Sequence, residues 1–350
     1  MTIIALRMVS VCLFLLLPST FAISEAPAAG YQVIKKIPVG GAGGWDYLTM
    51  DSAGRRLYVS HATKVVVIDV DKNEVVGEIL EANGVHGIAL APKLNRGFTS
   101  NGRDATVTIF DLKTLKVIGQ AKTGGNPDAI LYDPATSRVF TFNRTRAAAD
   151  ATLTMIDAAS GEVTGTIPLG GRPEFAVADG KGQVFVNLDD KSEVVVIDSR
   201  KGAIIQRWPL APGEEPSGLA MDVKNRRLFS VCGNQKMIVM NADNGRVITD
   251  LPIGKNTDGA AFDPDTRLAF SSNGEGTLTV VREESPDKFS VVENVKTQQG
   301  ARTLAVDFKT HNIYLSTAEY GPPPAATPEQ PNPRPSIVPG SFMVLVVGKH

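Results

Sequence analysis

A short sequence motif recurs seven times along the chain, and this repetition limits the folds that the chain can adopt. Each copy combines a glycine- or proline-containing turn with a polar residue and an apolar segment, as in Gly44-Trp45-Asp46-Tyr47 and Pro127-Asp128-Ala129-Ile130. The equivalent residues of the seven copies are Asp46, His86, Asp128, Glu174, Ser217, Asp258 and Arg302. Their spacing of 40 to 46 residues is that of a four-stranded β-propeller blade. The repeats therefore predict an all-β, seven-bladed β-propeller.

Each copy is expected to contain four strands. In the first copy these are residues 47–50, 56–60, 64–70 and 74–80, separated by reversals rich in Asp, Asn, Gly and Pro. Such residues favour tight hairpins. The third strand is apolar throughout, as in Val65-Val66-Val67-Ile68, and an unbroken apolar run indicates a strand that is covered on both faces. Blades that pack radially against two neighbours provide that cover.

The ring is predicted to close through its N-terminal segment. The seventh copy lacks a fourth strand, because the chain ends soon after the third one at 342–347. A segment with the sequence pattern of a fourth strand occurs instead at 31–39, which resembles the fourth strand at 162–169. We expect residues 31–39 to form the outer strand of the last blade, which removes an open sheet edge. Residues 31–350 would then form a single domain.

The first 22 residues have the pattern of a secretory signal peptide. Arg7 precedes an apolar run at 8–17, and small residues around Ala22 offer a cleavage site. The run is shorter than the roughly 20 residues that a membrane-spanning helix needs, so no transmembrane anchor is expected. Residues 23–30 are interpreted as a short linker. The mature protein is thus predicted to be periplasmic or secreted.

The copies resemble the repeat of the YVTN family of β-propellers. Tyr58-Val59-Ser60-His61, Phe98-Thr99-Ser100-Asn101 and Phe270-Ser271-Ser272-Asn273 stand where that family has its tetrapeptide, and the similarity covers residues 31–350. The fourth position departs from the pattern at His61, Leu188, Cys232 and Thr317. The family includes uncharacterised periplasmic proteins, surface proteins and some nucleic-acid binders. The resemblance therefore implies the fold more than an activity.

One face of such a propeller, here called the top face, is expected to carry the functional residues. The loops that lead into the first strand and out of the second strand of each blade lie on this side. The seven residues at the first-strand starts, six of them ionisable, would surround the mouth of the central channel. The second-strand ends add His61, Asn101, Asn143, Leu188, Cys232, Asn273 and Thr317. The structural alternative is that these polar side chains satisfy loop amides at strand ends.

Two kinds of chemistry are open at this mouth. The catalytic candidates are Asp46, His86, Asp128, Glu174 and Asp258. Converging carboxylates raise some of their pKa values and so supply a general acid for a hydrolase or lyase. A divalent metal is the candidate cofactor, with His61, His86 and Asp46 as ligands and Asp128 as a further one. No closely spaced ligand motif supports the metal site. Whether the chain is an enzyme stays open.

Arginines of the same face favour a ligand with an anionic group. Arg103, Arg144, Arg146, Arg172 and Arg302 fall in top-face loops or strand starts. A guanidinium binds a carboxylate or phosphate through two hydrogen bonds. The alternative for the first three is a solvated loop charge, and Arg302 is interpreted as a counter-ion of the acidic ring. The candidate ligand-binding residues are Asp46, His61, His86, Asn101, Asp128, Asn143, Arg172, Glu174, Asp258, Asn273, Arg302 and Tyr320.

The connection between the second and third strands of the last blade is too long for a hairpin turn. Residues 318–340 contain eight prolines, with Glu319 and Tyr320 at the base of the segment. Proline-rich stretches are stiff and extended. We expect this segment to lie over or beside the top face, either as a lid or partner-binding arm or as a disordered insertion.

The overall charge disfavours nucleic acid as a partner, because 36 Lys and Arg residues stand against 37 Asp and Glu residues. The leading hypothesis is an exported binding protein that holds a small polar or anionic ligand, or a segment of a protein partner, at the channel mouth. A hydrolase or lyase is the first alternative and a nucleic-acid-binding protein the second. The oligomeric state stays open.

Overall fold

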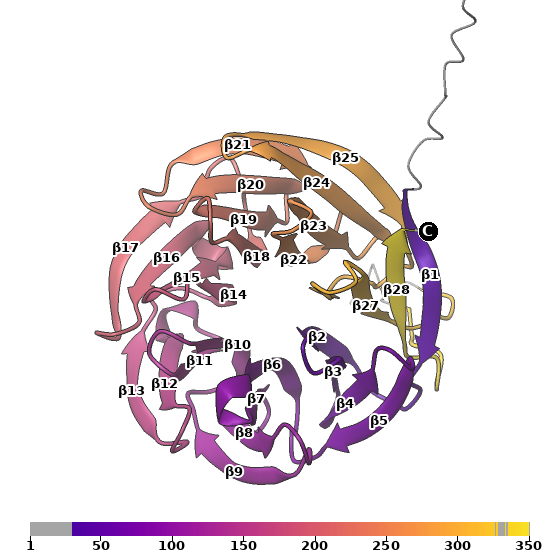
Figure 1. Cartoon of the computed structure of the whole chain (residues 1–350), viewed down its shortest axis with the longest axis horizontal. Helices are drawn as coiled ribbons and strands as arrows, with labels where there is room; N and C mark the ends of the chain where they lie inside the picture. Colours follow the sequence, from indigo (N-terminus) through magenta and orange to yellow (C-terminus); the bar gives the residue numbers. More distant parts are fainter. Residues whose placement is uncertain (1–29, 326, 328–332, 334, 350) are drawn as a thin grey trace, which may run out of the picture.

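A computed structural model describes residues 30–325, 327, 333 and 335–349. These residues form seven four-stranded antiparallel sheets, arranged as blades around a central axis (Figure 1). The prediction of an all-β, seven-bladed propeller is therefore confirmed. The predicted signal peptide at 1–22, most of the linker at 23–30, part of the Pro-rich segment at 318–340 and the final residue lie outside the described residues.

In blades one to three the strands follow the chain from the channel outwards. Blade one contains β2 (Trp45–Asp51), β3 (Arg56–His61), β4 (Lys64–Asp69) and β5 (Glu74–Ile79). Blade two contains β6 (Val85–Ala91), the 3₁₀ helix η1 (Pro92–Leu94), β7 (Arg96–Asn101), β8 (Thr106–Asp111) and β9 (Val117–Lys122). Blade three contains β10 (Pro127–Asp133), β11 (Arg138–Asn143), the 3₁₀ helix η2 (Ala148–Asp150), β12 (Thr152–Asp157) and β13 (Val163–Pro168).

Blades four to six repeat this order. Blade four contains β14 (Pro173–Ala178), β15 (Gln183–Leu188), the 3₁₀ helix η3 (Asp189–Lys191), β16 (Glu193–Asp198) and β17 (Ala203–Pro209). Blade five contains β18 (Pro216–Asp222), β19 (Arg227–Cys232), β20 (Lys236–Asn241) and β21 (Val247–Pro252). Blade six contains β22 (Thr257–Asp263), β23 (Leu268–Asn273), β24 (Thr277–Ser285) and β25 (Lys288–Lys296). Within the described ranges, no helix has the length and apolar character that crossing a membrane requires.

Blade seven is closed by the N-terminal segment of the domain, as predicted. It contains β26 (Leu304–Val306), β27 (Ile313–Thr317), β28 (Met343–Lys349) and, as its outer strand, β1 (Tyr31–Pro38). β1 pairs antiparallel with β28, with Tyr31 opposite Lys349 and Ile37 opposite Val344. Figure 1 shows the start of β1 beside the C-terminal end of the chain at the rim of the ring. The ring therefore has no open edge at this seam.

The hydrophobic core is divided among the seams between neighbouring blades. At the seam between blades seven and one, for example, Leu57 and Val59 pack with Tyr314 and Val344. The third strands are mostly buried, as their apolar sequences predict. Because each blade covers the next, truncating a fully buried side chain such as Phe98 costs about 3–5 kcal/mol of folding free energy.

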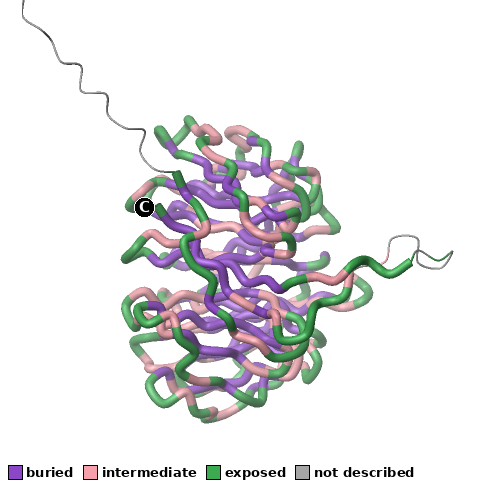
Figure 2. Tube along the Cα trace, turned by 90° about the vertical axis from the view of Figure 1, so that its right-hand side faces the viewer, coloured by how far each residue is buried: buried purple, intermediate pink, exposed green. Residues whose placement is uncertain are grey.

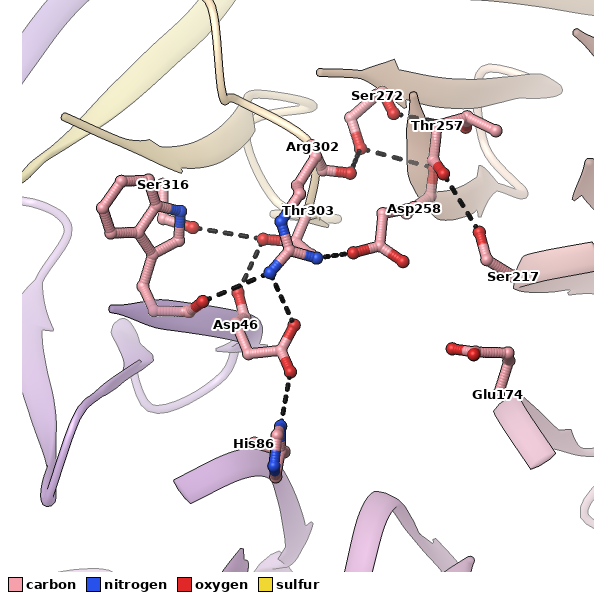
Figure 3. Close-up of polar contacts among 12 residues, drawn as sticks. Asp46, His86, Glu174, Ser217, Thr257, Asp258, Ser272, Arg302, Thr303 and Ser316 are labelled. Atoms are coloured by element: carbon pink, nitrogen blue, oxygen red, sulfur yellow. Dashed lines mark hydrogen bonds and ion pairs between the residues drawn. The ribbon is translucent and has the colours of Figure 1, made fainter. Parts of the chain in front are cut away.

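A β-bulge recurs in the inner strand of blades one to six. In blade one the pairing of β2 with β3 shifts between Trp45 and Leu48. Equivalent shifts occur in β6, β10, β14, β18 and β22. A bulge releases residues from the ladder and redirects their side chains. Asp46 and Glu174, which lie within such shifts, project towards the same open space of the channel mouth (Figure 3).

Candidate functional site

The channel mouth gathers the residues that the repeats place at the inner-strand starts. Asp128 and Glu174 are buried, while Asp46, His86, Asp258 and Arg302 are half-buried. The site is therefore a ring of partly desolvated charges, contributed by blades one, two, three, four, six and seven.

Backbone contacts fix the position of Asp46. Its amide N–H donates to the hydroxyl of Ser60 at 2.8 Å, and its carbonyl accepts from the hydroxyl of Thr303 at 2.6 Å (Figure 3). Ser60 lies in the neighbouring strand and Thr303 in the adjacent blade seven. Both backbone groups of Asp46 are thus satisfied, and its carboxylate is aimed at the channel.

His86 joins two carboxylates across the first two seams. Its Nδ1 lies 2.7 Å from Asp46 Oδ2 (Figure 3). The same atom lies 3.6 Å from Asp128 Oδ1. Burial works to lower the pKa of His86, but the hydrogen bond to Asp46 and the negative charges of Asp128 and Asp46 outweigh it and raise that pKa above the usual 6.5. The imidazole therefore has a strengthened tendency to carry a positive charge.

Arg302 occupies the opposite side of Asp46. Its guanidinium pairs with Asp258 of blade six and lies 3.4 Å from Asp46 Oδ1 (Figure 3). It also donates to the carbonyl of Trp45 at 3.4 Å. The structure thus gives Arg302 two carboxylate partners, in the counter-ion position that the sequence suggested.

Arg144 forms the other cationic centre of the mouth. Its Nη1 donates to Asp128 at 2.9 Å, and its Nη2 lies 2.8 Å from Glu174 and 3.7 Å from Asp189. Arg172 pairs with Asp189 at 2.7 Å. Arg144 and Asp189 were outside the predicted site residues, and the alternative of a solvated loop charge does not describe Arg144.

A sequence signal for Arg144 and Asp189 exists. Both directly follow the second strand of their blade, where the other five blades have a residue without a long side chain: Ala62, Gly102, Gly233, Gly274 and Ala318. Charged residues at a position that is otherwise kept small mark the loops that reach into the mouth.

Burial raises the pKa values of both Asp128 and Glu174. Arg144 faces Asp128, Glu174 and Asp189. Asp189 also pairs with Arg172 and Asp128 lies near His86, so among the ion pairs of the described residues Glu174 has the shared Arg144 as its one cationic partner. Burial is the largest influence and raises the pKa of Glu174 to about 9, with Asp128 and Asp189 adding to the shift and Arg144 opposing it. The site therefore favours the protonated form of Glu174, which can donate a hydrogen bond.

Two aromatic rings meet across the channel below this network. Tyr47 of blade one and Phe175 of blade four have ring centroids 5.0 Å apart, although their blades are not neighbours. Each ring follows an inner-strand start, where the other blades have Gly87, Ala129, Gly218, Gly259 and Thr303. Phe175 also lines a cavity of about 430 Å³ with Thr49 and Ile88. The aromatic pair thus bridges the channel between the ionic mouth and this cavity.

The asparagines predicted for the second ring lie inside the blades. Asn101, Asn143 and Asn273 are fully buried. Asn101 accepts from Thr99 at 2.8 Å and donates to Thr106 at 3.1 Å and Thr108 at 2.8 Å. Asn143 and Asn273 make the equivalent three bonds within their own blades. The structural alternative describes these residues, because their amides are committed to neighbouring strands.

His61 lies apart from the other candidate metal ligands. His61 is 2% exposed, and its ring stacks on Phe342 with centroids 4.4 Å apart. Burial lowers the pKa of His61. The ligand atoms of Asp46, His86 and Asp128 lie within 4.8 Å of one another, and this group does not include His61. Of the four candidate ligands, Asp46, His86 and Asp128 lie close together, and His61 lies outside this group.

Two cavities lie beside the network on the top face. The first has a volume of about 540 Å³ and is lined by Asp46, His86, Arg103, Asn126 and Arg302, with exposed backbone at Gly43 and Gly44. The second, of about 420 Å³, is lined by Trp45, Gln299, Arg302, Tyr320, Pro335 and Ile337. The structure therefore brings the base of the Pro-rich segment next to Arg302, whereas Arg146 lies exposed on its loop.

Comparison with known proteins supports the fold and leaves the family open. Among solved structures, 1754 chains are similar to this one. One of them, described as the structure of U3-55K, matches with a TM-score of 0.73 and 8% sequence identity, over 90% of this chain and 99% of that chain. No protein-family model matches the sequence, and neither does any curated protein. At this identity the likeness shows the propeller fold alone.

Proposed function

We propose that the protein is an exported binding protein that holds a small polar ligand with an anionic group at the top-face mouth of its propeller. The observation that carries this proposal is the lining of the 540 Å³ cavity. Arg103, His86 and Arg302 face it together with one carboxylate, that of Asp46. His86 and Arg302 already lie against the carboxylates of Asp46, Asp128 and Asp258, so among the described residues of this lining the charge of Arg103 is the one that is left for a ligand.

Arg103 is the cation best placed to receive the ligand. It is exposed, and among the ion pairs of the described residues it has no carboxylate partner. Arg302 is already paired with Asp258 and Asp46, so its charge is compensated within the protein. His86 binds Asp46 through Nδ1, which leaves Nε2 as the ring nitrogen for a ligand. A carboxylate or phosphate held between Arg103 and His86 would satisfy both groups.

The opposite side of the mouth provides further polar groups that a ligand could contact. Asp128, Glu174 and Asp189 surround Arg144, and Glu174 donates a hydrogen bond when it is protonated. A ligand with hydroxyl or amino groups beside its anionic group would find acceptors and a donor there. A segment of a protein partner with a free carboxylate would use the same contacts.

Export and family membership complete the proposal. The signal-peptide pattern of residues 1–22 supports a periplasmic or secreted location, and the YVTN-like repeats are consistent with it. Nucleic acid is the weaker partner class, because the chain has no net positive charge. Fractionation of cells that express the full chain tests the location: accumulation in the cytoplasm with residues 1–22 intact would contradict it.

The experiment for the binding site measures thermal stabilisation of the mature protein by a series of small anions, with inorganic phosphate and citrate as probes. Stabilisation that saturates with concentration is expected. Arg103→Gln should weaken the apparent affinity about tenfold, which is the loss of one charge-assisted contact. Arg146→Gln, an exposed top-face control, should leave it unchanged. Equal affinity in wild type and Arg103→Gln would place the anion site elsewhere.

A metal-assisted hydrolase or lyase is the second candidate function. It is favoured by one observation, the convergence of Asp46, His86 and Asp128 within 4.8 Å. One imidazole and two carboxylates are a donor set that suits a divalent metal. Metal analysis of the purified mature protein tests this candidate. Stoichiometric metal that is lost in His86→Ala supports it, and absence of bound metal after incubation with Zn²⁺, Mn²⁺ and Mg²⁺ contradicts it.

A further inference from the structure

The two top-face cavities adjoin each other, and together they are called the groove. Both are lined by Gly44, Trp45 and Arg302. The first cavity presents His86 and Arg103. The second continues from Arg302 to apolar side chains, among them Ile337 of the Pro-rich segment. A ligand that lies along the groove therefore meets cations at one end and an apolar wall at the other.

The apolar wall consists of two aromatic rings. Trp45 and Tyr320 have ring centroids 6.4 Å apart at an interplanar angle of 56°. Both side chains are partly exposed, so their surfaces are open to a ligand. Pro335 and Ile337 extend the wall. Planar or aliphatic groups gain from contact with such surfaces, and aromatic rings gain most.

The ring of Trp45 is fixed before any ligand arrives. It stacks on Phe342 with centroids 5.0 Å apart and an interplanar angle of 27°. Phe342 is 2% exposed and also stacks on His61. Trp45 thus cannot turn away without breaking this buried aromatic cluster, and a pre-positioned surface binds with less loss of entropy.

Tyr320 is held by the base of the Pro-rich segment. Tyr320 and Ile337 form a β-bridge. On either side, the amide of Gly321 donates to Ser336 at 2.8 Å, and the amide of Val338 donates to Glu319 at 2.8 Å. The tyrosine ring also covers Gly300, where an added Cβ would collide with its hydroxyl. The described stem of this segment projects from the body of the propeller (Figure 2).

From this groove we propose that the ligand joins its anionic group to an aromatic or flat apolar group. The anionic group binds between Arg103 and His86, and the ring lies against Trp45 and Tyr320. This inference rests on the proposed function and deepens it by naming the ligand class. An amphipathic carboxylate of this kind occurs as a free aromatic acid and as the C-terminal aromatic residue of a peptide.

Three matched probes separate the contributions of the two ends. 3-Phenylpropionate has both groups, propionate lacks the ring, and 3-phenylpropanamide lacks the charge. Calorimetric titration of the mature protein is expected to show 3-phenylpropionate binding about three- to tenfold more tightly than either partial probe. Gly-Gly-Phe and its C-terminal amide, titrated in the same way, distinguish a peptide source from a free acid.

Two variants assign the effect to the groove. Tyr320→Ala should reduce the affinity for 3-phenylpropionate towards that for propionate and leave propionate unchanged, while Arg103→Gln should weaken both carboxylates. Phe308→Ala removes an aromatic side chain that is 50% exposed and lines the Phe175 cavity instead, and serves as the control. Circular dichroism establishes that each variant is folded.

The outcomes separate this inference from the proposed function. Equal affinity for propionate and 3-phenylpropionate in wild type, with Arg103→Gln still weakening both, overturns the aromatic half and leaves the anion site standing. Equal binding of the acid and its amide overturns the pairing of charge with ring. Failure of every carboxylate to bind overturns both proposals.

Discussion

The Nδ1 atom of His86 lies 2.7 Å from the Oδ2 atom of Asp46, across the seam between blades two and one. Asp46 is also 3.4 Å from Arg302, which pairs in turn with Asp258. A chain of alternating charges therefore follows one side of the channel mouth. Its members come from successive blades, so the geometry of the ring and the electrostatics of the site depend on each other.

Removal of the Asp46 charge should lower the pKa of His86. Burial lowers the pKa of His86, while the hydrogen bond and charge of Asp46 help to raise it. Asp46→Asn removes the charge of Asp46, so the lowering effect of burial becomes stronger relative to what opposes it. NMR titration of the histidine ring protons measures the shift. Asp150→Asn, an exposed change on a top-face loop, is the control. An unchanged His86 pKa in Asp46→Asn would contradict the assigned coupling.

Protonated Glu174 should make stability depend on pH. Its folded-state pKa is about 9, above the usual 4.5, so the fold prefers the protonated form. The contribution is fully present below about pH 4.5 and is lost as the pH rises towards 9. Glu174→Gln cannot ionise, so urea denaturation should show the variant gaining stability relative to wild type between pH 5 and pH 9. Exposed Glu162→Gln is the control, and a pH-independent difference for Glu174→Gln would count against the protonated state.

Loss of Arg144 should destabilise the mouth strongly. Asp128, Glu174 and Asp189 would lose their shared cation while remaining largely buried. We expect Arg144→Met to reduce the free energy of unfolding by about 3 kcal/mol. Arg146→Met on the same loop should stay within about 0.5 kcal/mol of wild type. Urea denaturation at pH 7 measures both, and equal stability of the two variants would mean that Arg144 is a solvated charge.

The N-terminal strand should be necessary for a closed ring. Deletion of residues 31–39 exposes the edge of β28 and removes the buried side chains of Tyr31 and Ile37. The cost is expected to be about 4 kcal/mol or more, as for two core truncations. Thermal denaturation compares this deletion with Lys35→Ala, an exposed change in β1. An unchanged melting temperature for the deletion would show that blade seven is stable with three strands.

The architecture could be predicted because each blade repeats the same local pattern. Turn residues, apolar third strands and a constant spacing all indicate one four-stranded unit. The closing strand could also be predicted, because residues 31–39 have the same sequence pattern as the fourth strands of other blades. In repeat proteins the local sequence pattern and the overall fold agree, so the fold can be predicted from the sequence.

Strand periodicity explains why the asparagines predicted for the second ring lie inside the blades. Asn101 lies two residues after Thr99 and opposite Thr106, and Thr108 follows two residues later, so all four side chains share one face of the blade. The same spacing recurs around Asn143 and Asn273. A polar residue at alternate positions of two paired strands indicates an internal network and not a ligand site.

The cationic half of the site depended on contacts that span distant parts of the chain. Arg144 reaches carboxylates in both its own blade and the next one. Tyr320 meets Trp45 although the two residues are at opposite ends of the sequence. Such pairings depend on ring closure and on the directions of the side chains. The spacing of the repeats predicts ring closure, but it does not predict side-chain directions.

The most direct test of the binding site observes His86 while a probe anion is added. NMR titration of the mature protein with 3-phenylpropionate should shift the ring signals of His86 and raise its pKa further, because a bound carboxylate adds negative charge beside the imidazole. The ring signals of His311 should be unaffected. Its Nδ1 lies 2.7 Å from Asp263 Oδ2, at the seam between blades six and seven and away from the mouth. Saturable shifts at His86 alone are the predicted result. Shifts that are absent, or equal at His86 and His311, would contradict a ligand site at the channel mouth.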